Sequence, residues 1–285
     1  MNLSGVWLPI ITPFRDDKVD FESYKKLIEY YIGKGISGII PLGTTGEGPT
    51  IDGIEYEAII YKTMEFVDGR LPVFVGLGGN NTKKVLKELK TVEKYKVNGI
   101  LSVCPYYNRP DQRGIYQHFY SISQETGLNI IIYNIPYRTG RNIENETLFR
   151  LAELKSIVGV KDSCGDFKQT ADLILNKPEG FSVLTGEDMI FYSTLLLGGD
   201  GGILAASHIN TESFVKVYDF IKSNDHESAL KLWKSLHEFI PLLFQEPNPA
   251  PVKYWLQRKG LISSEEVRLP LTEISLGLKE KLDSI

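Results

Sequence analysis

Cysteine and histidine are scarce in this 285-residue sequence, and their scarcity excludes several kinds of site. The two cysteines, Cys104 and Cys164, have no metal-ligand spacing and offer no disulfide framework, which indicates a reducing compartment. The four histidines are scattered without a zinc-type spacing, so metal-dependent hydrolysis is not expected and no metal site is predicted. A Ser-His-Asp triad cannot be assembled from the predicted strand ends either.

Long apolar runs and an excess of charge are also lacking. No apolar stretch approaches the ~20 residues of a membrane span. The apolar run near the N-terminus is interrupted by Pro9 and Pro13 and follows no basic region, so we expect no signal peptide. A formal net charge of −4 gives no electrostatic reason to bind nucleic acid or an anionic membrane. With 42% hydrophobic and 24% charged residues, the composition is typical of a globular cytoplasmic protein.

What the sequence does contain is a regular alternation of short apolar runs and helical patterns. Strands are predicted at residues 6–11, 38–42, 73–75, 99–103, 129–133, 157–161, 181–184 and 202–204. Helices are predicted at residues 21–31, after Asp20, and at 52–66, 82–95 with Thr82 as its cap, 115–126, 144–154 and 189–197. Eight strands in such an alternation predict an α/β fold, a parallel (β/α)8 TIM barrel of about 250 residues, with a doubly wound open sheet as the alternative.

The C-terminal part of the chain has no further strand pattern. Apolar residues within 232–243 have helical spacing, and another helix is predicted at 253–259. We therefore expect residues 1–224 to form the barrel and residues 225–285 to form a helical region packed on it. This region is expected to serve packing or assembly rather than catalysis.

Lys161 ends the sixth predicted strand. The residues before it, Ile157–Val160, suit a buried strand, and the residues after it, Asp162–Gly165, have the composition of a turn. An amine in apolar surroundings loses hydration, which lowers its pKa and makes it a nucleophile toward a carbonyl carbon. The alternative is a surface lysine paired with Asp162.

Further polar residues follow other predicted strands, at the edge where (β/α)8 enzymes place their reacting groups. They are Thr44, Thr45, Tyr107, Tyr133 and Arg138. With Lys161 they provide one amine, two phenols, two hydroxyls and a guanidinium, without a carboxylate pair or an imidazole. The turn Gly43–Gly46 either presents backbone N–H groups to a small anion or is only a tight connection. The Tyr133 phenol either lies over the mouth of the barrel as a functional group or fills the mouth as an aromatic plug. The segment Gly198–Gly202 either binds a phosphate or forms part of the barrel wall, where small residues are needed.

Six motifs occur in order along nearly the whole chain. They are Thr12-Pro13-Phe14, Gly43-Thr44-Thr45-Gly46-Glu47, Pro105-Tyr106-Tyr107-Asn108-Arg109-Pro110, Tyr133-Asn134-Ile135-Pro136, Gly159-Val160-Lys161-Asp162 and Glu246-Pro247-Asn248-Pro249. In these motifs and their spacing the chain resembles the dihydrodipicolinate synthase / N-acetylneuraminate lyase family of Schiff-base aldolases. The resemblance favours Lys161 as a buried nucleophile over a surface lysine.

The resemblance implies a role for each motif residue, with no cofactor beyond a covalent imine. Lys161 forms that imine with pyruvate, and Tyr133 is the general acid/base. Thr44 relays protons between Tyr133 and Tyr107, and Tyr107 reaches into the site of a neighbouring subunit. Thr44 and Thr45 hold the pyruvate carboxylate. A homotetramer, built as a dimer of dimers, is implied as well.

Three further residues are implied to bind substrate, namely Arg138, Gly186 and Ile203. Dihydrodipicolinate synthases carry an arginine at the position of Arg138, which suits a bidentate grip on the carboxylate of L-aspartate 4-semialdehyde. The implied reaction therefore condenses pyruvate with this aldehyde to 4-hydroxy-tetrahydrodipicolinate. Two alternatives stay open: an aldolase for a 2-keto-3-deoxy sugar acid or N-acetylneuraminate, and a barrel that binds keto acids without turnover.

The sequence departs from the family at the cleft where some members bind L-lysine as an inhibitor. Asn80 and Tyr106 match those members, but Lys84 replaces a glutamate, and Gly53 and Tyr56 replace histidines. A second cation would repel the ε-ammonium group of lysine. The departures therefore predict weak or absent feedback inhibition. Leu77 and Gly79 also differ from common family residues in the loop after the third strand.

Overall fold

The structure is a computed structural model that describes residues 3–284. The chain forms two compact units: the first consists of Met1–Gly5 and Phe74–Ile203, and the second of Val6–Val73 and Leu204–Ile285. The division expected between residues 224 and 225 differs from this one and stays a prediction. Each unit is described below by itself.

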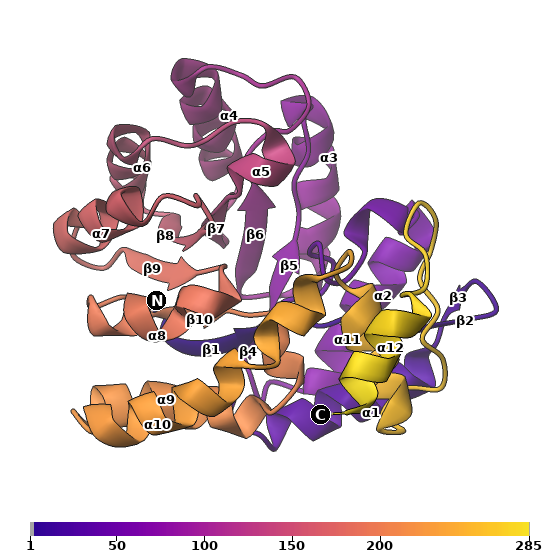
Figure 1. Cartoon of the computed structure of the whole chain (residues 1–285). Coiled ribbons are helices and arrows are strands. Elements are labelled where there is room, and N and C mark those ends of the chain that lie inside the picture. The colour runs from indigo at the N-terminus through magenta and orange to yellow at the C-terminus, as the bar shows by residue number, and fades with distance from the viewer. Residues whose placement is uncertain (1–2, 285) are drawn as a thin grey trace. The chain divides into compact units, whose positions relative to one another are not determined.

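The first unit is a parallel sheet with helices between its strands (Figure 1). The strands are β5 (Phe74–Gly76), β6 (Gly99–Val103), β7 (Asn129–Asn134), β8 (Ile157–Asp162), β9 (Ser182–Thr185) and β10 (Gly201–Ile203), in the order β10-β9-β8-β7-β6-β5. The helices are α3 (Thr82–Val92), η2 (Glu93–Tyr95), α4 (Gln112–Gln124), α5 (Pro136–Thr139), α6 (Asn145–Ala152), α7 (Phe167–Asn176), η3 (Asp188–Ile190) and α8 (Phe191–Leu196). Ile130, Ile131 and Ile132 are fully buried, as in parallel strands that are covered on both faces.

The second unit carries the remaining strands and the C-terminal helices. Strand β1 (Gly5–Leu8) pairs in parallel with β4 (Gly38–Ile39), and β2 (Phe14–Arg15) forms a hairpin with β3 (Lys18–Val19). The helices are α1 (Phe21–Ile32), η1 (Gly48–Thr50), α2 (Gly53–Val67), η4 (Ala206–His208), α9 (Thr211–Lys222), α10 (His226–His237), η5 (Ile240–Phe244), α11 (Ala250–Arg258) and α12 (Leu276–Asp283). Helix α1 begins directly after Asp20, as predicted, and the Asp20 side chain caps it by accepting from Ser23 N.

The eight parallel strands and the helices between them form a (β/α)8 barrel, as the sequence predicts. The strand order is β4-β1-β10-β9-β8-β7-β6-β5, and Val73, directly before β5, bridges in parallel to Ile39 of β4. Helices follow at the C-terminus. Among residues 3–284, no helix combines the length and the apolar character that a membrane crossing requires.

Several predicted boundaries are wrong, each for a local reason. Thr82 is not the cap of α3, because the Asn81 side chain accepts from Lys84 N instead. The apolar stripe in 232–243 is not one helix: α10 ends at His237, and a separate 3₁₀ turn with a proline in its first turn follows. Helix α11 begins three residues before the predicted start, since a proline in its first turn needs no N–H partner.

The glycine-rich segment 198–202 is packed as a wall. A Cβ on Gly201 would overlap the backbone of Gly5, and a Cβ on Gly199 would overlap the side chain of Thr194. The Asp200 carboxylate accepts from Val183 N (2.7 Å) and pairs with Lys177. The small residues are therefore explained by close backbone packing, without a phosphate.

Candidate active site

Lys161 and Tyr133 lie side by side on neighbouring strands of the first unit. They are register partners near the C-terminal ends of β8 and β7, and each is only 7% exposed. The Lys161 Nζ lies 4.2 Å from the centroid of the Tyr133 ring. The alternative of a surface lysine is therefore excluded by the burial of the side chain.

The surroundings of Lys161 change the pKa of its amine. Burial lowers the pKa of Lys161 to about 8, the carboxylates of Asp188 and Glu187 oppose this shift, and the Arg138 guanidinium adds to it. A pKa near 8 leaves roughly a tenth of the amine neutral at pH 7, against less than a thousandth for an ordinary lysine. The amine is thus available as a nucleophile near neutral pH.

Tyr133 stays protonated, because burial raises the pKa of its phenol well above the usual value. Tyr137 and Glu187 add to this shift, whereas Arg138 and the Ser163 hydroxyl oppose it. A protonated phenol beside an amine can donate a proton to an oxygen that becomes negative during a reaction.

Gly186 follows β9 and packs against the reacting side chain. Its N–H donates to Asp162 O (2.7 Å). A Cβ at this position would overlap the Ser163 Oγ and would come within 2.5 Å of the Lys161 Cε. Only glycine leaves room here for Lys161 in its observed position.

The other predicted residues of the first unit are Arg138, Ile203 and Tyr107, which differ in burial. Arg138 lies on α5, where it is exposed but acts electrostatically on both Lys161 and Tyr133. Ile203 ends β10 and is fully buried. Tyr107, in the loop after β6, is 89% exposed and has a φ of 71°.

Thr44 and Thr45 belong to the second unit, in the loop after β4. Thr45 is 4% exposed, and its Oγ1 accepts from Asn248 Nδ2 at 3.0 Å. Thr44 is half-buried, and its carbonyl accepts from Glu47 N at 3.1 Å. Gly46 O accepts from the Thr12 hydroxyl at 2.7 Å.

Comparisons with known proteins match nearly the whole chain to one family. A model described as the Dihydrodipicolinate synthetase family matches residues 2–285. A 4-hydroxy-tetrahydrodipicolinate synthase 2 of Clostridium acetobutylicum is 60% identical over 283 residues, which are 99% of this chain and 99% of that protein. The solved dihydrodipicolinate synthase of Aquifex aeolicus has a TM-score of 0.96 and 36% identity, covering 99% of this chain and 96% of that one.

The chain belongs to the dihydrodipicolinate synthetase family.

Dihydrodipicolinate synthetase membership confirms the resemblance inferred from the motifs, and the fold with it. A structure described as the first monomeric dihydrodipicolinate synthase variant has a TM-score of 0.97 at 40% identity and covers 99% of this chain and 95% of that one.

Three residues beside Lys161 were not predicted from the sequence. They are Ser163, Glu187 and Asp188. The predicted set of site residues contains no carboxylate, whereas Glu187 and Asp188 both act electrostatically on the amine. Their position directly after β9 was an available signal. Burial raises the pKa of Glu187, and the Ser163 hydroxyl and Lys161 oppose this. In residues 3–284 no group of three His, Cys, Asp or Glu side chains could hold a metal ion.

The rate at which the Lys161 amine forms an imine with pyruvate should rise with pH. Only the neutral amine attacks a carbonyl, and the pKa of Lys161 is lowered to about 8. The neutral fraction, and with it the rate at subsaturating pyruvate, should therefore increase about tenfold from pH 7 to pH 9 and then level off. The rate is measured by quenching the reaction with borohydride at timed intervals and determining the mass of the intact protein.

The variant Asp188→Asn provides the control. The Asp188 carboxylate raises the pKa of Lys161, so its removal should shift the whole profile to lower pH. A wild-type rate that still climbs steeply between pH 9 and pH 10 would contradict the lowered pKa.

Proposed function

We propose that this protein is a 4-hydroxy-tetrahydrodipicolinate synthase, a lyase that condenses pyruvate with L-aspartate 4-semialdehyde in lysine and diaminopimelate biosynthesis. The single observation that carries the proposal is the buried Lys161 amine beside the Tyr133 ring. The similarity to the Clostridium acetobutylicum synthase supports the choice of reaction. A cytoplasmic location is part of the proposal.

The chemistry begins with the neutral amine of Lys161, which attacks the keto carbon of pyruvate and forms an imine with loss of water. The protonated imine withdraws electrons, so that a proton leaves the methyl group and a nucleophilic enamine forms. The enamine carbon adds to the aldehyde carbon, and Tyr133 donates a proton to the resulting alkoxide. The amino group of the former semialdehyde then attacks the imine carbon, closes the ring and releases Lys161. No cofactor is needed.

The other predicted residues complete the site in this proposal. Thr44 and Thr45 hold the pyruvate carboxylate, with Gly186 and Ile203 against the bound keto acid. Thr44 relays protons between Tyr133 and Tyr107.

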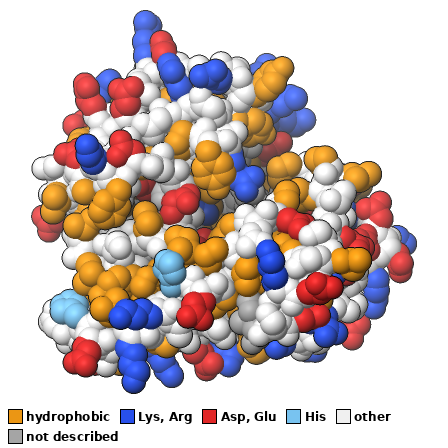
Figure 2. Space-filling model, in the orientation of Figure 1, with side chains coloured by type: hydrophobic (Ala, Val, Ile, Leu, Met, Phe, Trp, Pro, Cys, Tyr) orange, Lys and Arg blue, Asp and Glu red, His pale blue; other side chains and the backbone are white. Residues whose placement is uncertain are grey.

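We further propose a homotetramer in which Tyr107 serves the site of a neighbouring subunit. The 89% exposure of Tyr107 supports this assignment. Hydrophobic side chains also gather on the visible face of the first unit over α7 and α8 (Figure 2). Among the exposed hydrophobic residues of these helices are Phe167, Leu175 and Leu196. Weak or absent inhibition by L-lysine stays a prediction. Lys84, whose charge is the reason for this prediction, is exposed on α3.

The direct test of this function combines trapping with a substrate screen. Borohydride reduction in the presence of pyruvate should add the mass of the reduced pyruvyl group to one peptide, the one that contains Lys161. With pyruvate held constant, product should form with L-aspartate 4-semialdehyde and not with N-acetylmannosamine or small sugar aldehydes. Turnover of a sugar aldehyde alone would reject the proposed reaction.

Arg138→Ala should weaken the use of the semialdehyde far more than imine formation. Loss of a charge-assisted bond is worth about 1.5–3 kcal/mol, so kcat/KM for the semialdehyde should fall about 10- to 100-fold. Arg138 also lowers the pKa of Lys161, so imine formation below pH 8 should slow slightly. Steady-state kinetics and timed trapping measure the two effects.

Arg138→Lys is the matched control, because it keeps the charge but not the bidentate geometry. It should restore the rate of imine formation and only part of the semialdehyde use. Equal losses in both steps for Arg138→Ala would remove its assigned role.

A further inference from the structure

The loop that carries Thr44 and Thr45 has an unfavourable backbone conformation. Leu42 and Glu47, which flank it, are both in the left-handed region, with φ values of 62° and 53°. Side chains disfavour this region, so it persists only where surrounding contacts enforce it. The backbone is also tightly packed, since a Cβ on Gly46 would come within 2.9 Å of Leu42 N and one on Gly48 would overlap Leu42 O.

A buried ion pair holds one end of this loop. The side chains of Glu47 and of Lys253 on α11 are both 0% exposed, and they contact each other directly. Burial lowers the pKa of Lys253 to about 8, and Glu47 opposes this shift. The Lys253 Nζ also donates to Glu266 O (2.8 Å) and lies 4.0 Å from the centroid of the Phe14 ring. Both charges therefore have partners, without which burial would be very costly.

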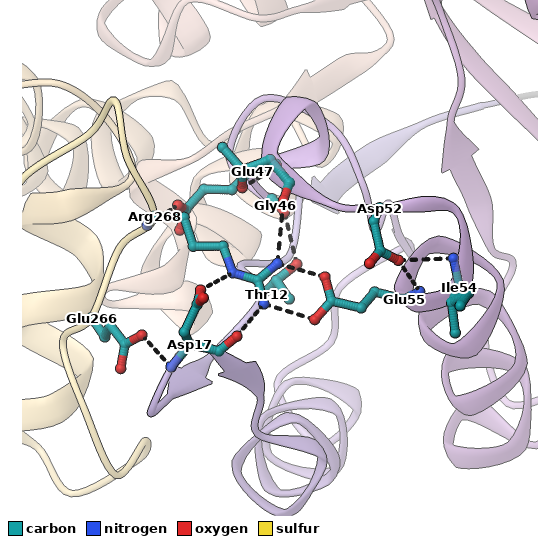
Figure 3. A network of polar contacts seen from close by, with 10 residues as sticks. Thr12, Asp17, Gly46, Glu47, Asp52, Ile54, Glu55, Glu266 and Arg268 are labelled. Atoms are coloured by element: carbon teal, nitrogen blue, oxygen red, sulfur yellow. Dashed lines mark hydrogen bonds and ion pairs between the residues drawn. The ribbon is translucent and has the colours of Figure 1, made fainter.

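Arg268 extends the same network, as Figure 3 shows. Its backbone N donates to Glu47 Oε2 at 3.0 Å. Its guanidinium binds both oxygens of Glu55, at 2.5 and 2.7 Å, and its Nη2 donates to Asp17 O at 2.6 Å. The guanidinium carbon lies 4.2 Å from the centroid of the Phe14 ring. Residues more than 200 positions apart in sequence are thus joined at Glu47.

A second contact from the C-terminal segment reaches Thr45 itself. The Asn248 Nδ2 donates to the Thr45 Oγ1, so this oxygen is an acceptor in that bond. The Thr45 hydroxyl proton is then left to donate elsewhere, which is what binding of a carboxylate requires.

We propose that the C-terminal segment 248–268 sets the conformation of the Thr44–Thr45 loop for pyruvate, with Asn248, Glu47 and Lys253 as positioning residues. The proposal rests on the assignment of Thr44 and Thr45 to the pyruvate carboxylate. It gives this segment a part in substrate binding, beyond the packing or assembly surface expected from the sequence.

The test measures pyruvate binding and stability separately in Glu47→Gln, Lys253→Met and the double variant. Each single variant leaves a buried charge without its partner, so both the melting temperature and pyruvate affinity should fall. The pyruvate concentration that gives half-maximal trapping should rise at least about tenfold, with little change in the rate at saturation. The double variant should recover most of the melting temperature but keep the raised pyruvate requirement.

Two further variants complete the test. Lys279→Met breaks a partly buried pair with Glu265 (2.6 Å) that does not involve the loop, and it should leave pyruvate binding unchanged. Asn248→Ala removes one neutral donor. It should raise the pyruvate concentration for half-maximal trapping at least about fivefold, while the melting temperature stays within about 3 °C of the wild-type value. This variant therefore still tests the proposal if the charge variants do not fold.

The outcomes separate this inference from the proposed function. Recovery of pyruvate binding together with stability in the double variant would overturn the inference, as would unchanged binding in Asn248→Ala. Absence of any pyruvate adduct on Lys161 in the wild type would instead reject the proposed function.

Discussion

Lys161→Ala should abolish the formation of a reducible pyruvate adduct and lower kcat by at least about a thousandfold, because the covalent step has no substitute nucleophile. The described structure offers no equivalent amine beside Tyr133: the Lys161 Nζ is the one at 4.2 Å from that ring. The variant should remain folded, since it removes a buried amine whose pKa is already lowered by poor hydration. Intact-mass measurement after borohydride reduction and a coupled activity assay give the two results.

Lys168→Ala is the matched control for this experiment. Lys168 lies seven residues further on, in α7, and is exposed to solvent. Its replacement should leave both the adduct and the activity unchanged. An adduct that persists in Lys161→Ala and disappears in Lys168→Ala would show that Lys168, and not Lys161, forms the imine. The proposed mechanism would then be rejected.

Lys161 could be found from the sequence because the signal for it is local. The apolar run Ile157–Val160 predicts a buried strand, and the structure confirms that β8 continues through Lys161 to Asp162. The depressed pKa follows from burial, which the same run predicts. Helix α7 is not among the predicted helices, although Thr170, Leu173 and Ile174 form a buried helical stripe after the Asp166 cap.

The support of the Thr44–Thr45 loop could not be predicted in the same way. No local pattern gives Leu42 or Glu47 a left-handed backbone, since both residues disfavour it. The pairing of Glu47 with Lys253 joins positions that only the folded chain brings together. Periodicity and turn signals report neighbours within a few residues, whereas buried charges are placed by tertiary packing.

Gly186→Ala should slow imine formation about 100-fold without unfolding the protein, since a misplacement of about 1 Å at a reacting group can cost that much. The new Cβ would overlap the Ser163 Oγ and lie 2.5 Å from the Lys161 Cε, so the amine must move. The backbone itself accepts alanine, because Gly186 is not among the glycines with positive φ. Overpacking of this kind costs typically ~1–3 kcal/mol of stability, and the melting temperature should therefore fall by only a few degrees. Timed borohydride trapping measures the rate, and Gly127→Ala is the control because nothing lies within 4 Å of its added Cβ. Trapping at the wild-type rate in Gly186→Ala would show that the observed position of Lys161 is not the one from which it reacts.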